Sequence, residues 1–105
     1  MKALQNQIKK TLAIKGVLID ESKDEAALLH LIALYVQELI DHDFEKLLHT
    51  LYRIDIPDYK VKKAVEESAP GDAPKVIAKL ILEREKEKID TREKFKSKGE
   101  DDWIF

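Results

Sequence analysis

The feature that most constrains this chain is one apolar stretch, residues 23–40, which is too short to cross a membrane and too apolar to lie on a surface. Twelve of its 18 residues are apolar, and they fall on more than one face of a helix. A membrane-spanning helix needs about 20 apolar residues, whereas the densest apolar run here, residues 26–36, is 11 residues long and is interrupted by His30. A helix that is apolar nearly all round is packed by neighbours on several sides. We therefore expect residues 23–40 to form the central helix of a bundle.

Four further helices are predicted from apolar residues at helical spacing and from capping residues. They cover residues 2–15, 44–53, 57–68 and 73–97. With only three Gly and three Pro, the chain has too few turn residues for an all-β fold. The sequence thus predicts an all-α fold of about five helices, with one domain at residues 1–98 and a short acidic and aromatic tail at 99–105. At ~1.5 Å per residue, the charged last helix would be ~37 Å long and would project past the bundle.

Capping residues mark several of the predicted helix boundaries. Ser22 with Glu25 has the spacing of a capping box before the central helix, and Asp43 is a suitable N-cap for residues 44–53. Asp55 is expected to cap residues 57–68, with Arg53 beside it. Within residues 44–53, the positions of one apolar face are occupied by Phe44, Leu47, Leu48 and Leu51.

Several classes of function are disfavoured by the composition. The chain has no cysteine, which removes thiolate metal sites, disulfides and cysteine nucleophiles. A stripe of Glu38, His42, Glu45 and His49 would resemble a metal site on one continuous helix, but it runs across the break expected at Asp43. A net charge of −2 is unlike that of a general nucleic-acid binder. We expect a cytoplasmic protein with no catalytic residues, no metal, no cofactor, no nucleic acid and no membrane contact.

The tripeptide Leu51-Tyr52-Arg53 resembles the signature of the mitochondrial LYR-motif proteins, small helical subunits that bind acyl carrier protein. In that family the motif lies near the start of the first helix, whereas here it closes a middle helix. Our interpretation is structural: Leu51 lies in the core, Tyr52 is half-buried, and Arg53 favours the negative helix end or pairs with Asp55.

Two longer motifs carry a broader resemblance. The first runs from Asp43 to Ile56 in the form DF..LL..LYRIDI, and the second from Ile77 to Arg92 in the form IA.LI.ER...KI.TR. Over about residues 28–96 the chain resembles a family of small bacterial proteins, although Pro57 and Asp58 stand where that family often has an acid. The resemblance implies a helical architecture and a bacterial, cytoplasmic setting, and it assigns no activity.

Two functions compete on this evidence. The first is a non-enzymatic interaction module, an adaptor or regulatory subunit that presents helical faces to a protein partner. The alternative is an anion- or nucleotide-responsive protein that uses basic residues of the last helix. Such a site would consist of Arg84, Lys88 and Arg92, which recur at steps of four, together with Arg53. A row of this kind is more often a solvated helix face.

The last helix and the tail also suggest self-association. Leu82 and Ile89 share a face with Ala78, nearly opposite the main apolar stripe of that helix. The chain ends in three large apolar residues, Trp103, Ile104 and Phe105. We predict a homodimer through the Leu82/Ile89 face, the tail or both, because a symmetric dimer is the commonest closed assembly. The alternative is a tail folded back on its own bundle.

Overall fold

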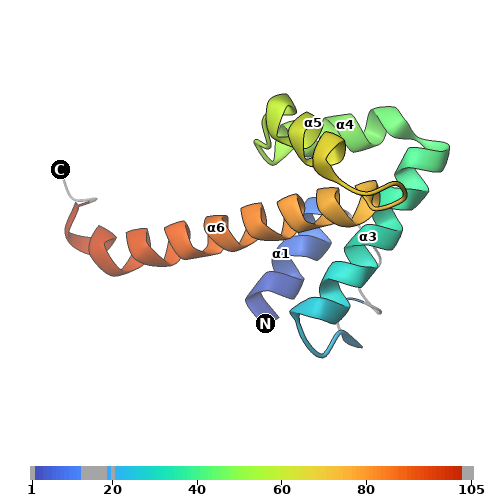
Figure 1. Ribbon diagram of the computed structural model, residues 1–105. Helices are drawn as coiled ribbons and strands as arrows, with labels where there is room; N and C mark the ends of the chain where they lie inside the picture. The colour runs from blue at the N-terminus through green and yellow to red at the C-terminus, as the bar shows by residue number, and fades with distance from the viewer. Residues whose placement is uncertain (1, 13–18, 20, 103–105) are drawn as a thin grey trace.

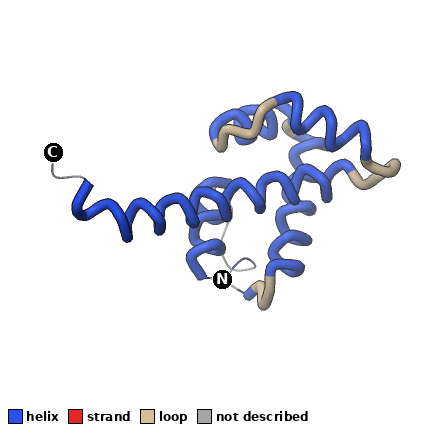
Figure 2. Tube along the Cα trace, turned by 60° about the vertical axis from the view of Figure 1, so that its left-hand side comes forward, coloured by secondary structure: helices blue, strands red, loops and turns tan. Residues whose placement is uncertain are grey.

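A computed structural model describes residues 2–12, 19 and 21–102, with side chains described as far as residue 93. These residues form five α-helices and no strand, which confirms the all-α prediction (Figures 1 and 2). The helices are α1 (Lys2–Leu12), α3 (Glu25–His42), α4 (Phe44–Arg53), α5 (Asp58–Glu67) and α6 (Ala73–Asp102). The predicted end of the first helix at residues 13–15 lies outside the described residues.

The core forms where α6 passes the other helices. Its most extensive packing is against α3, and it also packs against α1 and α5, while α4 packs on α3 (Figure 1). The predicted central helix therefore shares the middle of the bundle with the first half of α6. The helices α1, α3, α4 and α6 each contribute at least two buried apolar side chains to this core. These include Leu4, Ile8, Leu28, Ile32, Val36, Leu47, Leu51, Ile77 and Ile81.

The last helix is longer than predicted. It spans 30 residues and continues through Gly99 to Asp102, instead of ending at residue 97. The predicted boundary between domain and tail at residues 98 and 99 thus falls inside α6. At ~1.5 Å per residue the helix is ~45 Å long, and its second half extends beyond the other helices (Figures 1 and 2). The predicted projection of this helix is therefore confirmed.

The start of α3 differs from the predicted capping box. Asp24 is the N-cap, and its side chain accepts a hydrogen bond from the backbone N–H of Ala27 at 2.8 Å. The hydroxyl of Ser22 instead donates to the carbonyl of Ile19 at 2.5 Å and accepts from the side-chain amide of Gln5 at 3.1 Å. Ser22 is therefore occupied in tying α1 to the segment before α3, which is why the helix begins two residues later than predicted.

Asp43 separates α3 from α4 as predicted. Its backbone N–H donates to the carbonyl of Leu39 at 2.8 Å, and its side chain accepts from the backbone N–H of Lys46 at 3.2 Å. One residue therefore ends the first helix and caps the next.

The junction between α4 and α5 corrects the prediction for Asp55. This residue has a φ of 62° and lies just beyond the C-terminus of α4, not at the start of α5. The N–H of Ile56 donates to the carbonyl of Leu51, and that of Asp55 to the carbonyl of Tyr52, each at 3.1 Å. These two bonds define a Schellman motif, and the buried Ile56 and Leu51 are its expected apolar pair. The residue before α5 is Pro57, with no side-chain capping bond.

No helix among the described residues is long and apolar enough to span a membrane.

Candidate functional site

Helix α4 carries two apolar stripes, and only one of them is buried. Leu47 and Leu51 lie in the core, while Phe44, Leu48 and Tyr52 are 54%, 47% and 82% exposed. The exposed residues recur at steps of four, which places them on one face of the helix. The prediction that Tyr52 is half-buried is therefore wrong, and only Leu47 and Leu51 of the predicted apolar face reach the core, because α4 meets the core along a narrow face. The spacing i, i+4, i+8 of Phe44, Leu48 and Tyr52 in the sequence could have indicated this exposed stripe.

This exposed stripe borders an open groove of about 990 Å³ between α4 and α5, which we call the α4/α5 groove. Helix α5 has no buried residue, so its apolar side chains are available on this side. The apolar lining of the groove consists of Leu48, Leu51, Tyr52, Val61 and Val65. A groove of this size lined by apolar and aromatic side chains is the usual form of a binding surface.

The charged residues of the α4/α5 groove are mostly acidic. Glu45, Asp58 and Glu66 contribute three carboxylates against the single ammonium group of Lys62, and His49 completes the polar lining. The groove therefore carries an excess of negative charge at neutral pH. It would attract a ligand with a basic edge.

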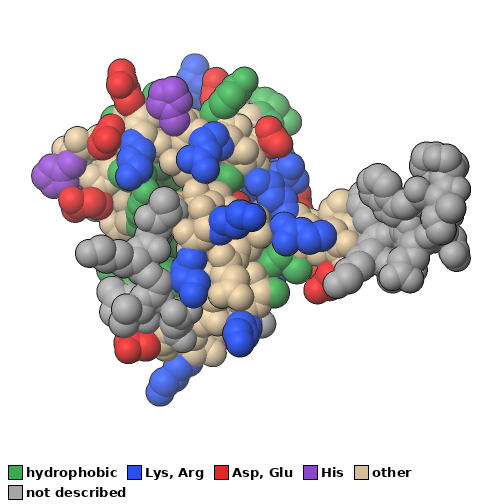
Figure 3. All heavy atoms as spheres, turned by 180° about the vertical axis from the view of Figure 1, so that it is seen from behind, with side chains coloured by type: hydrophobic (Ala, Val, Ile, Leu, Met, Phe, Trp, Pro, Cys, Tyr) green, Lys and Arg blue, Asp and Glu red, His purple; other side chains and the backbone are tan. Residues whose placement is uncertain are grey.

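A second hollow, of about 210 Å³, lies where α1, the end of α4 and α6 meet. We call it the basic hollow. Its side chains that carry charge or hydrogen-bonding groups are Gln7, Lys10, Thr11, Arg53, Lys88 and Arg92, and Ile54 completes the lining. Figure 3, the view from behind Figure 1, shows Lys and Arg side chains gathered near the point where α6 leaves the bundle.

The basic hollow brings together three of the four predicted anion-binding residues. Arg53, Lys88 and Arg92 line it, and Lys10 of α1, which the sequence analysis missed, is the fourth cation. Arg84 does not line the hollow. It donates from Nε to the carbonyl of Ile54 at 2.9 Å and lies 3.7 Å from the carboxylate of Asp55, so Arg84, not Arg53, is the partner of Asp55.

A buried carboxylate lies beside one of these cations. Glu85 is fully buried, and neither of its carboxylate oxygens has a hydrogen-bond partner among the described residues. Its Oε1 is 3.9 Å from Nζ of Lys88, which is itself 26% exposed. An unpaired buried charge is strongly destabilising. The ion pair with Lys88 is therefore the main compensation that the structure provides for Glu85.

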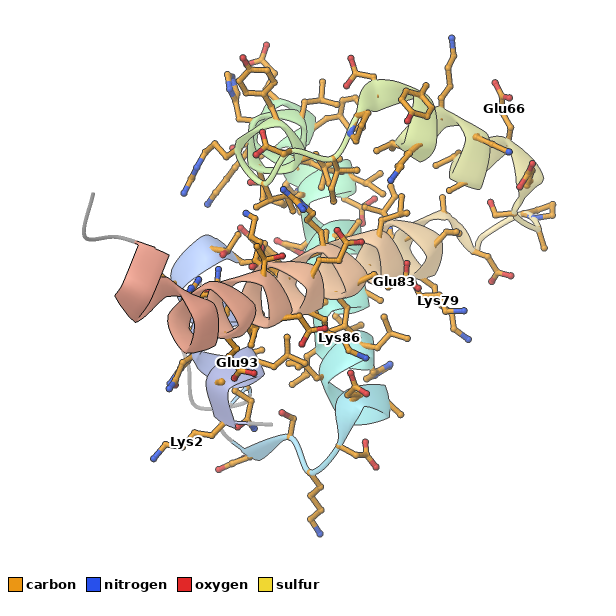
Figure 4. All side chains as sticks on the ribbon, turned by 90° about the vertical axis from the view of Figure 1, so that its left-hand side faces the viewer. Lys2, Glu66, Lys79, Glu83, Lys86 and Glu93 are labelled. Carbon is orange, nitrogen blue, oxygen red and sulfur yellow. The ribbon has the colours of Figure 1, made fainter. Side chains whose placement is uncertain are left out.

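A second ion pair joins α6 to the start of α3. Nζ of Lys86 lies 2.7 Å from the carboxylate of Glu25, and this hydrogen bond, together with the negative charge of Glu25, raises the pKa of Lys86. Figure 4 shows Lys86 where α6 passes α3, with Lys79 and Glu83 in a row with it nearer the start of α6, all three exposed. The pair is half-exposed and serves to hold the two helices together.

The residues predicted to form a dimer interface differ in their burial. Leu82 is only 8% exposed and belongs to the core of a single chain, and Ile89 is half-buried against that core. The prediction of a second, outward-facing apolar strip is therefore wrong for Leu82, because α6 is surrounded by other helices at this level. Trp103, Ile104 and Phe105 lie outside the described residues.

The stripe considered for a metal is divided by the helix break at Asp43. His42 and Glu38 pair at 3.8 Å on α3, while Glu45 and His49 line the α4/α5 groove. Within the described ranges, no group of three or more His, Cys, Asp or Glu side chains is placed to hold a metal ion.

The chain has no significant match to a protein-family model, a curated protein or a solved structure. The resemblance to the small bacterial family therefore stays a prediction from the two motifs.

Proposed function

We propose that this protein is a non-enzymatic interaction module whose α4/α5 groove binds an amphipathic helix of a protein partner. The observation that carries the proposal is the exposed stripe of Phe44, Leu48 and Tyr52 beside a groove of about 990 Å³. Exposed apolar side chains that adjoin one another mark interaction surfaces, whereas scattered ones are normal. The bacterial, cytoplasmic setting remains a prediction from the motif resemblance.

The chemistry of the groove defines the partner. Its apolar residues come from two helices that leave a channel between them, the arrangement used to bind the apolar face of a third helix. The partner is expected to carry apolar anchors at i, i+3 or i+4, and i+7. Lysine or arginine beside these anchors would pair with Glu45, Asp58 and Glu66.

Binding is favoured over catalysis by the exposure of the polar lining. His49 and Glu45 lie one turn apart on α4, and both are exposed. Catalytic acids and bases are usually held in desolvated sites that shift their pKa values. Glu45 and His49 are instead open to solvent.

Part of a second copy of the chain also has the required chemistry. In the sequence after Glu93, Lys94, Lys96 and Lys98 are interleaved with Phe95, whereas residues 100–102 are acidic and are followed by Trp103, Ile104 and Phe105. We propose that the predicted homodimer forms by docking of this segment into the α4/α5 groove of the other copy. Up to Asp102, α6 extends away from α4 and α5, which favours contact with another molecule over contact with its own groove (Figure 1).

The proposal is tested with labelled peptides and fluorescence anisotropy. The probes are a helical peptide of leucine anchors flanked by lysines, the same peptide with glutamates for lysines, and a peptide of residues 92–105 of this chain. The lysine peptide should bind at least about tenfold more tightly than the glutamate peptide, a difference of about 1.4 kcal/mol. Equal affinity for the two designed peptides would contradict the charge complementarity.

Two leucine variants locate the binding surface. Leu48→Asp, within the groove, should weaken binding of the lysine peptide by at least about tenfold, since it places a charge in the apolar contact. Leu34→Asp is the matched control, because Leu34 is 55% exposed on α3 and lies outside the groove. Equal losses in both variants would contradict the assignment.

Sedimentation of the intact chain decides between a foreign partner and a second copy. If the docking segment belongs to a second copy, the wild-type chain should dimerise at tens of micromolar, and Leu48→Asp and a chain ending at Lys98 should both remain monomeric. A wild-type monomer that still binds the lysine peptide would exclude the homodimer and leave the interaction module intact.

A further inference from the structure

The basic hollow has the charge of an anion site. Four cations line it, from Lys10, Arg53, Lys88 and Arg92, and its described lining contains no carboxylate. Neither Lys10 nor Arg53 forms an ion pair or side-chain hydrogen bond with another described residue. Among the described residues, only Lys88 of these four lies near a carboxylate, that of Glu85, so the cations repel one another. A bound anion would relieve this repulsion.

The size and donors of the hollow limit what the anion can be. Its volume of about 210 Å³ is below the ~300–1,000 Å³ of pockets that enclose drug-sized ligands, so it suits a group of a few heavy atoms. Arg53 and Arg92 offer planar guanidinium groups, which pair with phosphate or carboxylate oxygens through two parallel hydrogen bonds. Thr11 adds a hydroxyl donor beside them.

Three backbone carbonyls near the hollow are already occupied by hydrogen-bond donors. Helix α4 ends here, and free C-terminal carbonyls would present partial negative charge. The carbonyls of Leu51, Tyr52 and Ile54 already accept hydrogen bonds, the first two from the Schellman motif and the third from Arg84. Arg84, assigned to the anion from the sequence, therefore acts as a positioning residue.

Other contacts hold the cations in place before a ligand arrives. The guanidinium of Arg92 donates to the side-chain oxygen of Gln7 at 3.1 Å, which fixes it between α6 and α1. Lys88 is held by the buried carboxylate of Glu85 at 3.9 Å. Four cations outnumber the single neighbouring carboxylate among the described residues, that of Glu85, so the hollow has an excess of positively charged groups. This excess exceeds what one carboxylate would neutralise and suits a doubly charged group.

We propose that the basic hollow binds a single phosphate group, either as inorganic phosphate or as the phosphate of a small phosphorylated metabolite. The site is separate from the α4/α5 groove, so the proposal does not depend on the proposed function. The assignment rests on four cations, a small volume and hydrogen-bond donors converging from three elements of the fold.

Inorganic phosphate is the first probe, measured by thermal unfolding against sodium chloride at equal ionic strength. Ligands that bind only the folded state raise the midpoint, and in a domain of this size the rise should be about 4 °C or more once phosphate exceeds its Kd by about tenfold. O-phosphoserine is the second probe and represents a phosphorylated metabolite. Tighter binding of one probe identifies which source the hollow prefers, and an effect no larger than that of chloride for both would overturn the proposal.

Three variants locate the site by their Kd for phosphate. Arg53→Gln and Lys10→Gln should each weaken binding at least about tenfold, because each removes a charged donor. Lys63→Gln is the matched control, since Lys63 is an exposed cation on α5 outside the hollow, and it should leave the Kd unchanged. Equal weakening by Lys63→Gln would show general screening of surface charge and would overturn the proposal.

The variant Glu85→Gln separates a binding role from a structural one. It keeps the shape of the side chain and removes the negative charge behind Lys88. Phosphate affinity should increase severalfold, and this increase should disappear when Lys88 is also replaced by Met. Unchanged or weaker phosphate binding by a folded Glu85→Gln protein would contradict the proposed electrostatics of the hollow.

Discussion

Arg84 in α6 donates a hydrogen bond from Nε to the backbone carbonyl of Ile54 at 2.9 Å, a contact between residues 30 positions apart in the sequence. The same guanidinium lies 3.2 Å from the carboxylate of Glu87 and 3.7 Å from that of Asp55. Arg84 thereby fastens the end of α4 to α6. Since α4 borders the groove and its end lines the basic hollow, this one side chain positions part of both sites.

We expect Arg84→Met to lower the free energy of unfolding by about 1–3 kcal/mol, because it leaves the carbonyl of Ile54 without its donor while keeping most of the apolar stem. Urea unfolding measures the change. Lys79→Met, an exposed cation on the same helix, should stay within about 0.5 kcal/mol of the wild type. Equal effects from the two substitutions would remove the structural role assigned to Arg84.

Asp55→Gly is expected to stabilise the protein by about 0.5–1 kcal/mol, because glycine adopts a positive φ without a steric penalty. The side chain of Asp55 is 77% exposed and its ion pair with Arg84 is long, so its removal costs little. Asp55→Ala should be less stable than Asp55→Gly by about 1 kcal/mol. If both variants were destabilised equally, the Schellman geometry would not be what sets the stability at this position.

Glu85→Leu should raise the free energy of unfolding by about 1–3 kcal/mol, since it replaces a buried carboxylate without a hydrogen-bond partner by an apolar group of similar size. Lys88→Met should lower it, because the buried carboxylate would lose its nearest cation. Chemical unfolding of both variants checks the opposite signs. A less stable Glu85→Leu protein would mean that the carboxylate makes a favourable contact in the folded state.

The ion pair between Glu25 and Lys86 gives a pH-dependent contribution to stability. Because its folded-state pKa is raised, Lys86 contributes stability that is fully present below its ordinary pKa of about 10.5 and is lost as the pH rises through the folded-state pKa. The difference in Tm between the wild type and Glu25→Gln should therefore be constant between about pH 6 and pH 9, where Glu25 is charged, and shrink at higher pH. A difference that stays constant up to pH 12 would assign the effect of Glu25 to the N-terminus of α3 alone.

The helices and the break at Asp43 could be predicted because they depend on local patterns. Apolar spacing and a capping carboxylate act within a few residues, and the structure confirms both at the junction of α3 and α4. Asp55 was misassigned because aspartate is favoured both as an N-cap and in the left-handed conformation that ends a helix. Only the hydrogen bonds that the N–H groups of Ile56 and Asp55 donate to carbonyls of α4 show that Asp55 ends a helix and does not cap the next one.

The candidate sites were less predictable because they depend on which helices meet. Periodicity shows that α4 has two apolar stripes, but only the packing of α4 on α3 decides that Leu48 is exposed and Leu47 is buried. The row of Arg84, Lys88 and Arg92 was visible in the sequence. Arg84 makes a structural contact with Ile54, just after α4, whereas Lys88 and Arg92 join Lys10 of α1 in the basic hollow, and neither arrangement can be read from the row itself.

The central claim is that the α4/α5 groove is the surface that binds a partner, and amide NMR of the isotopically labelled chain with the lysine peptide tests it most directly. We predict saturable shift changes concentrated at groove residues such as Leu48, Tyr52 and Val65, with Leu34 and Arg92 unaffected. Changes confined to the basic hollow or to α3, or no saturable change at millimolar peptide, would contradict the account.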